Sequence, residues 1–162
     1  MQIRLLDPYS DRAMVDAFFR TAADYIRLER GEDSGSEVTE EFFTDTPPGC
    51  DPSANLKFGL FDSEMIGVAD LAFGYPGPTD GYIGLMIISP AARGRGAGPV
   101  LLRYLEHLAR ARHMQGLYLG VLDANPKGRA FWEREGFTLA LANRPVTIGT
   151  KTQIAHRLGK AL

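Results

Sequence analysis

A glycine-rich segment with two arginines carries the clearest chemical signal in the sequence. Residues 93–98 read Arg-Gly-Arg-Gly-Ala-Gly and follow an apolar run at residues 82–88. Glycines let a backbone approach a ligand closely. A helix that begins just after them presents unpaired N–H groups and the positive end of its dipole. Such a turn suits a phosphate, and Arg93 and Arg95 would add positive charge.

The phosphate motif differs from the two most familiar kinds. A P-loop needs Gly-x-x-x-x-Gly-Lys-Ser/Thr, a string that this sequence lacks. The dinucleotide fingerprint Gly-x-Gly-x-x-Gly also fails, because its last position falls on Pro99 or Leu101. What fits is Arg-x-x-Gly-x-Gly at Arg93, Gly96 and Gly98. We expect a side chain at either of these glycines to occupy the space of the phosphate.

A second motif, residues 125–137, follows the next apolar run at residues 117–122. It opens with Asn125 and a proline, which is a favourable N-cap and first helical position. Its later residues include Phe131 and Trp132. A capped amphipathic helix of this kind is common on its own, so its position after the glycine segment is what makes it informative.

Together the two motifs resemble the acetyl-CoA motifs of the GNAT superfamily of N-acetyltransferases, and the resemblance covers residues 82–137. It implies transfer of an acetyl group from acetyl-CoA directly to a primary amine of a small molecule or peptide. It implies neither a covalent enzyme intermediate nor a metal. The alternative is a non-catalytic acyl-CoA-binding module of the same fold, which release of free CoA would distinguish from an enzyme.

The resemblance also implies which residues bind acetyl-CoA. The backbone of Ile87 and Ile88 would hold the pantetheine arm, provided that the central strand splays away from the next one. Around the pyrophosphate and pantetheine the binding residues would be Arg93, Gly94, Arg95, Gly96, Ala97, Gly98 and Asn125. Trp132 would face the cofactor near its thiol end, and Phe131 would pack in the core.

At two positions the chain departs from the catalytic groups that are usual in the family. The family often has a tyrosine acid where this chain has Trp132, and an indole N–H is not a usable acid. Many members carry a carboxylate base on the central strand, where this chain has Tyr82 and Gly84. The candidates are Tyr25, Glu29, Asp70, Asp80, Tyr82 and Tyr118, and a water relay is equally open. Without a base of raised pKa, kcat/KM should climb from about pH 6 to about pH 9 without a break near neutrality.

The acceptor site should lie across the sheet from the phosphates. Its walls would be residues 25–43, the turn at residues 74–80 and the tail strands. The first of these segments is acidic, which suits a cationic amine. His156 and Arg157 on the last predicted strand are further candidates, whereas Cys50 reads as a bystander.

The elements that position these residues follow from periodicity and capping. Residues 10–30 are predicted to form one helix with Ser10 as its N-cap. Ser34 and Glu37 match the capping-box spacing of a second helix that continues through residues 42–43.

The predicted strands are residues 2–6, 56–62, 65–74, 82–88 and 117–122, with two more in the tail, and the later helices are residues 98–113 and 126–136. The order β-α-α-β-β-β-α-β-α-β-β predicts a single domain of residues 1–162. We expect a mixed α+β fold with a mostly antiparallel sheet of about seven strands and helices on both faces.

Composition narrows the class of protein. The chain has 162 residues, of which 44% are hydrophobic, and its net charge is −2. That balance argues against nucleic-acid binding. The charged N-terminal stretch does not read as a signal peptide, and no apolar run approaches the roughly 20 residues of a membrane span. We therefore expect a cytoplasmic protein. The sequence does not decide between a monomer and a homodimer.

Overall fold

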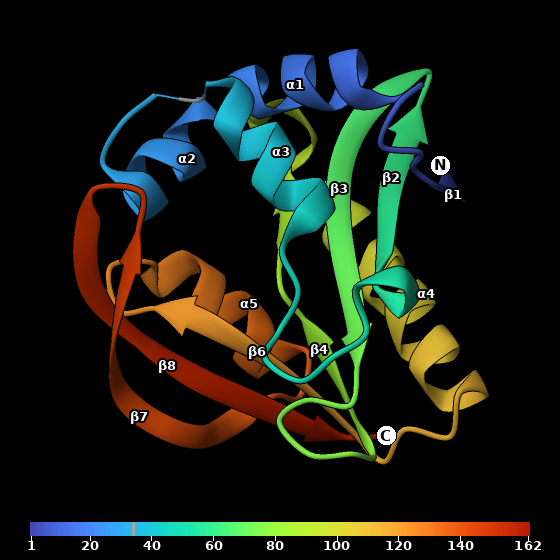
Figure 1. Cartoon of the computed structure of the whole chain (residues 1–162), viewed down its shortest axis with the longest axis vertical. Coiled ribbons are helices and arrows are strands. Elements are labelled where there is room, and N and C mark those ends of the chain that lie inside the picture. Colours follow the sequence, from blue (N-terminus) through green and yellow to red (C-terminus); the bar gives the residue numbers. More distant parts are fainter. Residues whose placement is uncertain (34) are drawn as a thin grey trace.

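An eight-stranded sheet separates two groups of helices in the computed structural model, which describes residues 1–33 and 35–162 (Figure 1). The elements are β1 (Gln2–Leu5), α1 (Arg12–Thr21), α2 (Ala23–Arg30), α3 (Ser36–Thr44), β2 (Leu56–Asp62), β3 (Glu64–Phe73), β4 (Asp80–Ile83), β5 (Met86–Ile88), α4 (Ala97–Ala111), β6 (Gly116–Leu122), α5 (Pro126–Arg134), β7 (Thr138–Ile148) and β8 (Lys151–Ala161). The strand order is β1-β2-β3-β4-β6-β8-β7, with β5 beside β3. Only β4 and β6 pair in parallel among the described strands, which confirms the mixed, mostly antiparallel sheet.

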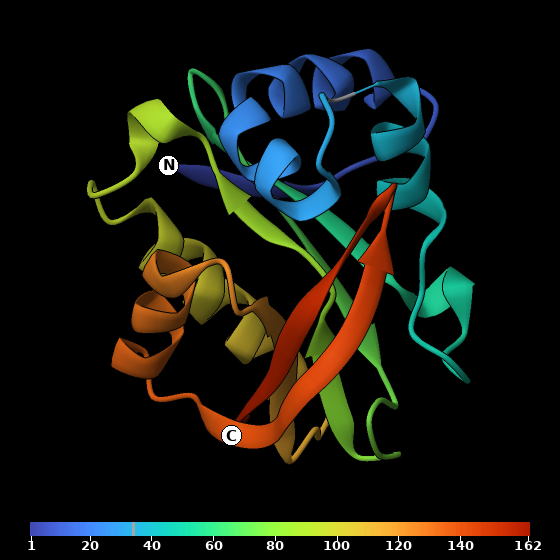
Figure 2. The same ribbon diagram turned by 90° about the vertical axis from the view of Figure 1, so that its left-hand side faces the viewer.

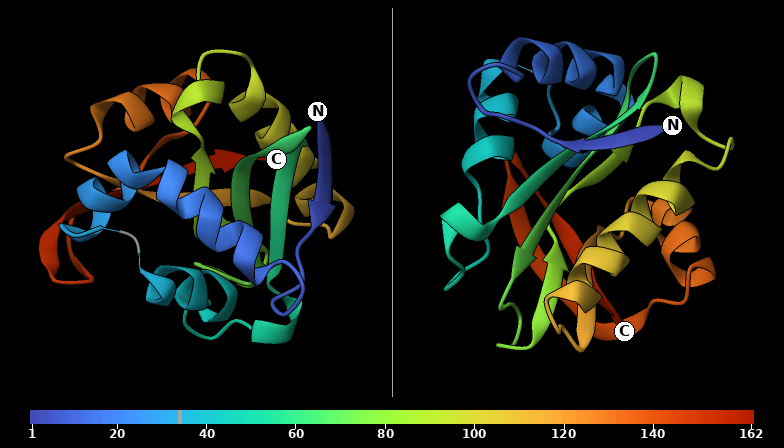
Figure 3. Two further views of the ribbon diagram at one scale, coloured as in Figure 1. Left: turned by 90° about the horizontal axis from the view of Figure 1, so that it is seen from above. Right: turned by 90° about the vertical axis from the view of Figure 1, so that its right-hand side faces the viewer.

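Helices cover both faces of the sheet, as the element order predicted. Helices α1, α2 and α3 lie on one side, and α4 and α5 lie on the other (Figure 3). The period-two alternation of strand side chains makes a core on each face. On β3, Val68 packs toward α1 while Ala69 and Leu71 pack toward α4. Within the described part of the chain, no helix is long and apolar enough to cross a membrane.

The predicted first helix is two helices, because the chain bends at Ala22, which has φ −97° and ψ 26°. Helix α1 has Asp11 rather than Ser10 as its N-cap residue. The Ser10 hydroxyl donates instead to Asp7, 3.1 Å away, so Ser10 belongs to the turn before the helix. Helix α3 has Gly35 as its N-cap residue, and the predicted capping residue Ser34 lies outside the described residues.

The strand predicted at residues 82–88 is also divided, into β4 and β5, with Gly84 and Leu85 between them. Asp70 on β3 stabilises the break between β4 and β5 through two hydrogen bonds. Its Oδ1 accepts a hydrogen bond from the Gly84 N–H at 2.8 Å, and its own N–H donates to the Leu85 carbonyl at 2.9 Å. Lys57 on β2 lies with its Nζ 3.1 Å from Asp70 Oδ2, and both residues are only 6% exposed.

The division of this strand opens the sheet. Strand β4 pairs with β3 on one side and β6 on the other, whereas β5 pairs with β3 alone. The last paired residues of β4 and β6 are Ile83 and Leu119. Beyond this pair the chain continues into β5, which diverges from β6. This is the splay that the central strand needs if its backbone is to bind a ligand.

The tail forms a long hairpin, β7 and β8, whose tip reaches α2 (Figure 2). Lys151 Nζ donates to the Leu28 carbonyl at 3.1 Å, and Gln153 Nε2 donates to the Glu29 carbonyl at 2.8 Å. Carbonyls in the last turn of a helix lack intrahelical partners. The hairpin therefore caps α2 and fixes the side chains of its last turn over the sheet.

Replacing Asp70 by Ala should reduce stability by about 3–5 kcal/mol, because the buried Lys57 ammonium loses its counter-ion. Urea unfolding measures this difference. The double variant Lys57→Met/Asp70→Ala should recover part of the loss, since no buried charge is left unpaired. A loss below about 1 kcal/mol in Asp70→Ala would contradict a structural role for the pair.

Candidate active site

The opening between β5 and β6 forms a narrow crevice of ≈ 30 Å³. Its lining residues are Tyr25, Ile83, Gly84, Leu85, Met86, Leu119, Gly120, Val121, Leu122, Asn125 and Trp132. The crevice brings together α2, the divided strand, β6 and the start of α5, which are far apart in the sequence.

The backbone of β5 faces this crevice at alternate residues. The Leu85 carbonyl and the Ser89 N–H both bond to β3. Because the residues of an antiparallel strand face their partner alternately, Ile87 also faces β3, and Met86 and Ile88 face away from it. The backbone groups predicted to bind a ligand were those of Ile87 and Ile88. In the structure the Ile87 backbone belongs to the ladder with β3, and the backbones of Met86 and Ile88 are the ones that face away from that ladder.

The glycine segment ends at the first turn of α4. Gly94 and Gly96 have φ +75° and +83°, and Gly96 is the N-cap residue, without any side-chain cap. A Cβ on Gly96 would meet nothing within 4 Å, whereas a Cβ on Gly98 would lie 3.1 Å from the Phe131 ring. Gly96 therefore borders open space, as expected from the sequence. Gly98 instead allows α4 and α5 to pack closely, so a side chain there would meet the Phe131 ring as well as the space that was predicted for the phosphate.

Arg93 holds the glycine segment in place. Its Nε donates to the Ile88 carbonyl at 2.9 Å, and its NH2 group lies 3.1 Å from Asp24 on α2. Its backbone N–H donates to the Ser89 carbonyl at 3.2 Å. Arg93 was predicted to bind a phosphate, and in the structure its amide and part of its guanidinium already have protein partners. The exposed part of the segment is Gly94, Arg95 and Gly96, whereas Ala97 is buried and Gly98 is half-buried.

Helix α5 begins as predicted, because the Asn125 side chain accepts a hydrogen bond from the Gly128 N–H at 2.9 Å. The two aromatic residues both pack against the core, and of the two only Trp132 lines the crevice. Trp132 is the buried one, 8% exposed, and packs edge-on against Phe137. Phe131 is half-buried beside Gly98. Trp132 still lines the crevice, so its indole borders the site from within the core.

Two larger cavities lie on the α1–α3 face of the sheet. The α3-side cavity, of ≈ 510 Å³, is lined mainly by α2, α3, the following loop, β3 and β4. The β8-side cavity, of ≈ 260 Å³, is lined mainly by α2, β4, β7 and β8. Residues common to both include Glu29, Tyr75, Tyr82 and Gly84, and Gly84 also lines the crevice. The three spaces thus meet at the division of the central strand, with the walls that were predicted for an acceptor site.

Glu29 lines both larger cavities, and its carboxyl group has a raised pKa. Burial raises its pKa from 4.5 to about 7, and the nearby Glu41 carboxylate acts in the same direction. Arg30 and the Tyr25 hydroxyl act in the opposite direction. A carboxyl group with a pKa near neutrality can accept a proton at physiological pH and release it again.

The other catalytic candidates differ in their structural contacts and in whether they line the crevice or the two cavities. Burial raises the pKa of Asp70, but its carboxylate bonds to Lys57 and Gly84. Asp80 accepts the Gly77 N–H at 3.0 Å and stabilises a turn. Neither Asp80 nor Tyr118 lines the crevice or the two larger cavities.

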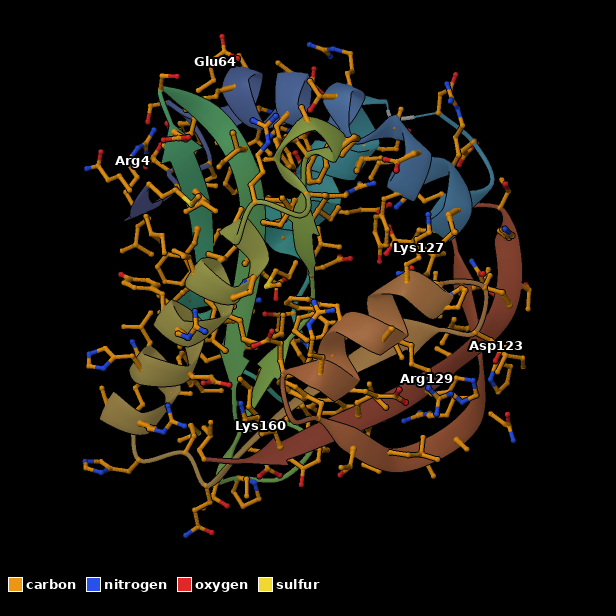
Figure 4. All side chains as sticks on the ribbon, turned by 180° about the vertical axis from the view of Figure 1, so that it is seen from behind. Arg4, Glu64, Asp123, Lys127, Arg129 and Lys160 are labelled. Carbon is orange, nitrogen blue, oxygen red and sulfur yellow. The ribbon has the colours of Figure 1, made fainter. Side chains whose placement is uncertain are left out.

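Tyr82 and Tyr25 do line these spaces, and burial raises the pKa of both hydroxyls, which keeps them protonated. His156 has both ring nitrogens engaged. Its Nδ1 accepts the Asn143 N–H at 3.1 Å, and its Nε2 lies 2.9 Å from the Asp123 carboxylate at the molecule's edge (Figure 4). Cys50 does not line the crevice or either cavity, so it is not placed to act as a nucleophile there.

Lys57 was not singled out in the sequence, and Tyr75 and Arg144 were included only within the predicted walls of the acceptor site, the turn at residues 74–80 and the tail strands. Lys57 lies in the predicted strand at residues 56–62, whereas Arg144 lies in the Asn-Arg-Pro sequence around which the tail strands were predicted. Only the pairing of β2 with β3 and the irregular course of β7 show that one is buried and the other borders a cavity.

Comparison with known proteins identifies the family. The sequence model of the GNAT acetyltransferase family matches residues 17–137. The chain belongs to this family. It is 35% identical over 68 residues to an acetyltransferase of Agrobacterium fabrum, a match that covers 42% of this chain and 48% of that protein. The chain thus matches about half the length of this curated relative.

Solved structures agree with the GNAT fold. The crystal structure of an acetyltransferase from Thermus thermophilus has a TM-score of 0.74 and 26% identity, and the match covers 100% of this chain and 98% of that one. A ribosomal-protein-alanine N-acetyltransferase from Brucella melitensis has a TM-score of 0.73, and the match covers 100% of both chains. At 18% identity, the latter shows the fold alone.

The raised pKa of Glu29 predicts a pH-dependent stability difference. A carboxyl group whose pKa is higher in the folded state stabilises the fold at low pH, and this contribution is lost as pH rises through about 7. Glu29→Gln should therefore match the wild type near pH 4 and exceed it at pH 8 by about 3 kcal/mol, since each pKa unit is worth about 1.4 kcal/mol. Urea unfolding at both pH values measures this. Glu64→Gln, at an exposed hairpin residue, is the control that should show no such trend.

Proposed function

We propose that the protein is an acetyl-CoA-dependent N-acetyltransferase that transfers the acetyl group directly to a primary amine. The observation that carries this proposal is the meeting of the crevice and the two cavities at Gly84. An extended thioester substrate can reach this point along β5, and an amine can reach it from the α1–α3 face. Family membership supports acetyl transfer in general, and the geometry supports these two approaches.

The chain offers acetyl-CoA a binding surface made largely of backbone. The amides of Met86 and Ile88 can pair with the amides of pantetheine, as an added strand would. Gly94 to Gly98 and the N-terminus of α4 can hold the pyrophosphate. Arg93 positions this segment, and the exposed Arg95 adds charge. Asn125 fixes the start of α5 beside the crevice.

Glu29 is the proposed general base. An acceptor ammonium has a pKa of about 10.4 and must lose a proton before nitrogen can attack a carbonyl. Glu29 lines both cavities and accepts that proton above its pKa of about 7. Attack forms the new C–N bond and a tetrahedral oxyanion, which backbone N–H groups facing the crevice stabilise. As the oxyanion collapses, the C–S bond breaks and the thiolate leaves. The attacking nitrogen then releases its second proton to water and becomes the amide.

The leaving thiolate needs no dedicated acid. Trp132 cannot supply a proton, and burial makes the Tyr25 phenol a weaker acid than a free tyrosine by raising its pKa. Tyr25 lines the crevice and therefore serves as a hydrogen-bond donor beside the sulfur. The proton that Glu29 holds at a pKa of about 7 passes downhill to a thiolate of pKa about 8.5, which restores the base.

Acetyl-CoA should raise the unfolding free energy by about 2.7 kcal/mol at 100 times its dissociation constant. Gly96→Val should abolish this shift, because the side chain enters the open space at the start of α4. Gly49→Val is the matched control, since Gly49 also has a left-handed φ, +78°, and open space around its Cβ position. Differential scanning fluorimetry measures both, and an unchanged wild-type melting temperature at millimolar acetyl-CoA would refute the binding site.

The pH profile tests the base. With Glu29 as base, kcat/KM should rise tenfold per pH unit below about pH 7 and level off above it. This replaces the unbroken climb expected without a base. Glu29→Gln should lose about 100-fold in activity and lose the break. Glu64→Gln should keep both.

Two outcomes would reject parts of this proposal. An unaltered break in Glu29→Gln would move the base elsewhere. Binding of acetyl-CoA without release of CoA for any amine would favour the acyl-CoA-binding module, which the replacement of the family's tyrosine by Trp132 suggests as the alternative.

A further inference from the structure

Two arginines line the same cavity as the proposed base. Arg144 on β7 and Arg157 on β8 border the β8-side cavity, which Glu29 also lines. Arg157 donates to the Tyr75 hydroxyl at 2.6 Å. Both guanidinium groups act to lower the pKa of the Tyr82 hydroxyl, against the larger effect of burial, which places their charge beside the same wall. Within residues 1–33 and 35–162, neither arginine forms a salt bridge with a carboxylate.

Arg144 reaches this cavity only because β7 is irregular. Leu141 pairs with Arg157 and Arg144 pairs with Ala155, so β7 has one residue more than β8 over this stretch. In a regular strand, side chains three residues apart point to opposite faces. The extra residue therefore returns Arg144 to the face that it shares with Arg157.

His156 stabilises the irregularity. Its Nδ1 accepts the N–H of Asn143, which has φ +56°, and its Nε2 bonds to Asp123. A non-glycine residue with positive φ needs such support from its surroundings. The buried imidazole thus acts as a positioning group for the neighbouring Arg144.

We propose that the acceptor is an amino acid, with its carboxylate bound by Arg144 and Arg157 and its amine directed toward Glu29. This inference rests on the proposed N-acetyltransferase function and adds the substrate class. Guanidinium groups bind carboxylates through paired charge-assisted hydrogen bonds. A cavity of ≈ 260 Å³ with cations on one wall and a carboxyl group on another is complementary to a small zwitterion.

A matched substrate panel tests this class. Each of L-leucine, L-methionine and L-phenylalanine is compared with its α-amide and with its decarboxylated amine, and β-alanine and γ-aminobutyrate vary the separation of amine and carboxylate. CoA release should favour at least one free amino acid over its amide and amine by about 10- to 100-fold in kcat/KM. Equal or better turnover of the amides would indicate a peptide N-terminus and overturn the inference.

Variants of Arg144 assign the preference to this cavity. Arg144→Ala should raise KM for the preferred amino acid by about tenfold or more and leave the matched amine nearly unchanged. Arg144→Lys should recover part of the loss, because the charge remains while the paired geometry does not. Arg103→Ala, an exposed arginine on α4, is the control. Equal losses for both substrates would show a merely structural role and contradict the inference.

Failure of this inference can be distinguished from failure of the proposed function. Turnover of amines without preference for a carboxylate would reject the amino-acid acceptor alone. If no compound is turned over, calorimetric titration of the same panel decides. Binding of a free amino acid that Arg144→Ala weakens would support the cavity's role without the catalysis. If no free amino acid binds either, both the amino-acid acceptor and the proposed function for this panel are rejected.

Discussion

The carboxylate of Asp70 lies in the middle of the sheet, where an isolated charge would be very costly. Lys57 neutralises it, and the Gly84 N–H gives it a hydrogen bond. A Cβ on Gly84 would lie 2.6 Å from this carboxylate, so the position must be glycine. Satisfying this one buried charge divides the central strand, turns β5 away from β6 and creates the point at which all three cavities meet.

The two sides of the site are built differently along the chain. The surface proposed for acetyl-CoA comes from neighbouring stretches of sequence, β5 to α4 and the start of α5. The acceptor side combines α2, near the start of the sequence, with β4 and β6 from its middle part and with β7 and β8 at its end. The tip of the hairpin holds it together, because Gln153 bonds directly to the carbonyl of Glu29.

Much of the fold could be predicted from the sequence, because capping, glycine turns and periodicity are local. The Asn125 cap and the hairpin of β2 and β3 are such cases. The division at Gly84 could not be seen, because its cause is a carboxylate on another strand. That Met86 rather than Ile87 faces away from β3 follows only from the pairing register of β5 with β3. The position of Arg144 follows only from the extra residue in β7. The raised pKa of Glu29 likewise arises from packing between distant elements.

The irregular course of β7 has a further consequence at the outer margin of the sheet. This strand is the last in the order, and it exposes Leu139 and Leu141 by about half. An exposed apolar edge invites another chain to add a strand. Pro145 lacks the N–H that such an addition would use, and the breaks in register near Leu141 and Arg144 interrupt the row of backbone groups. The residues that bend β7 to direct Arg144 inward thereby also protect the molecule from edge-to-edge aggregation.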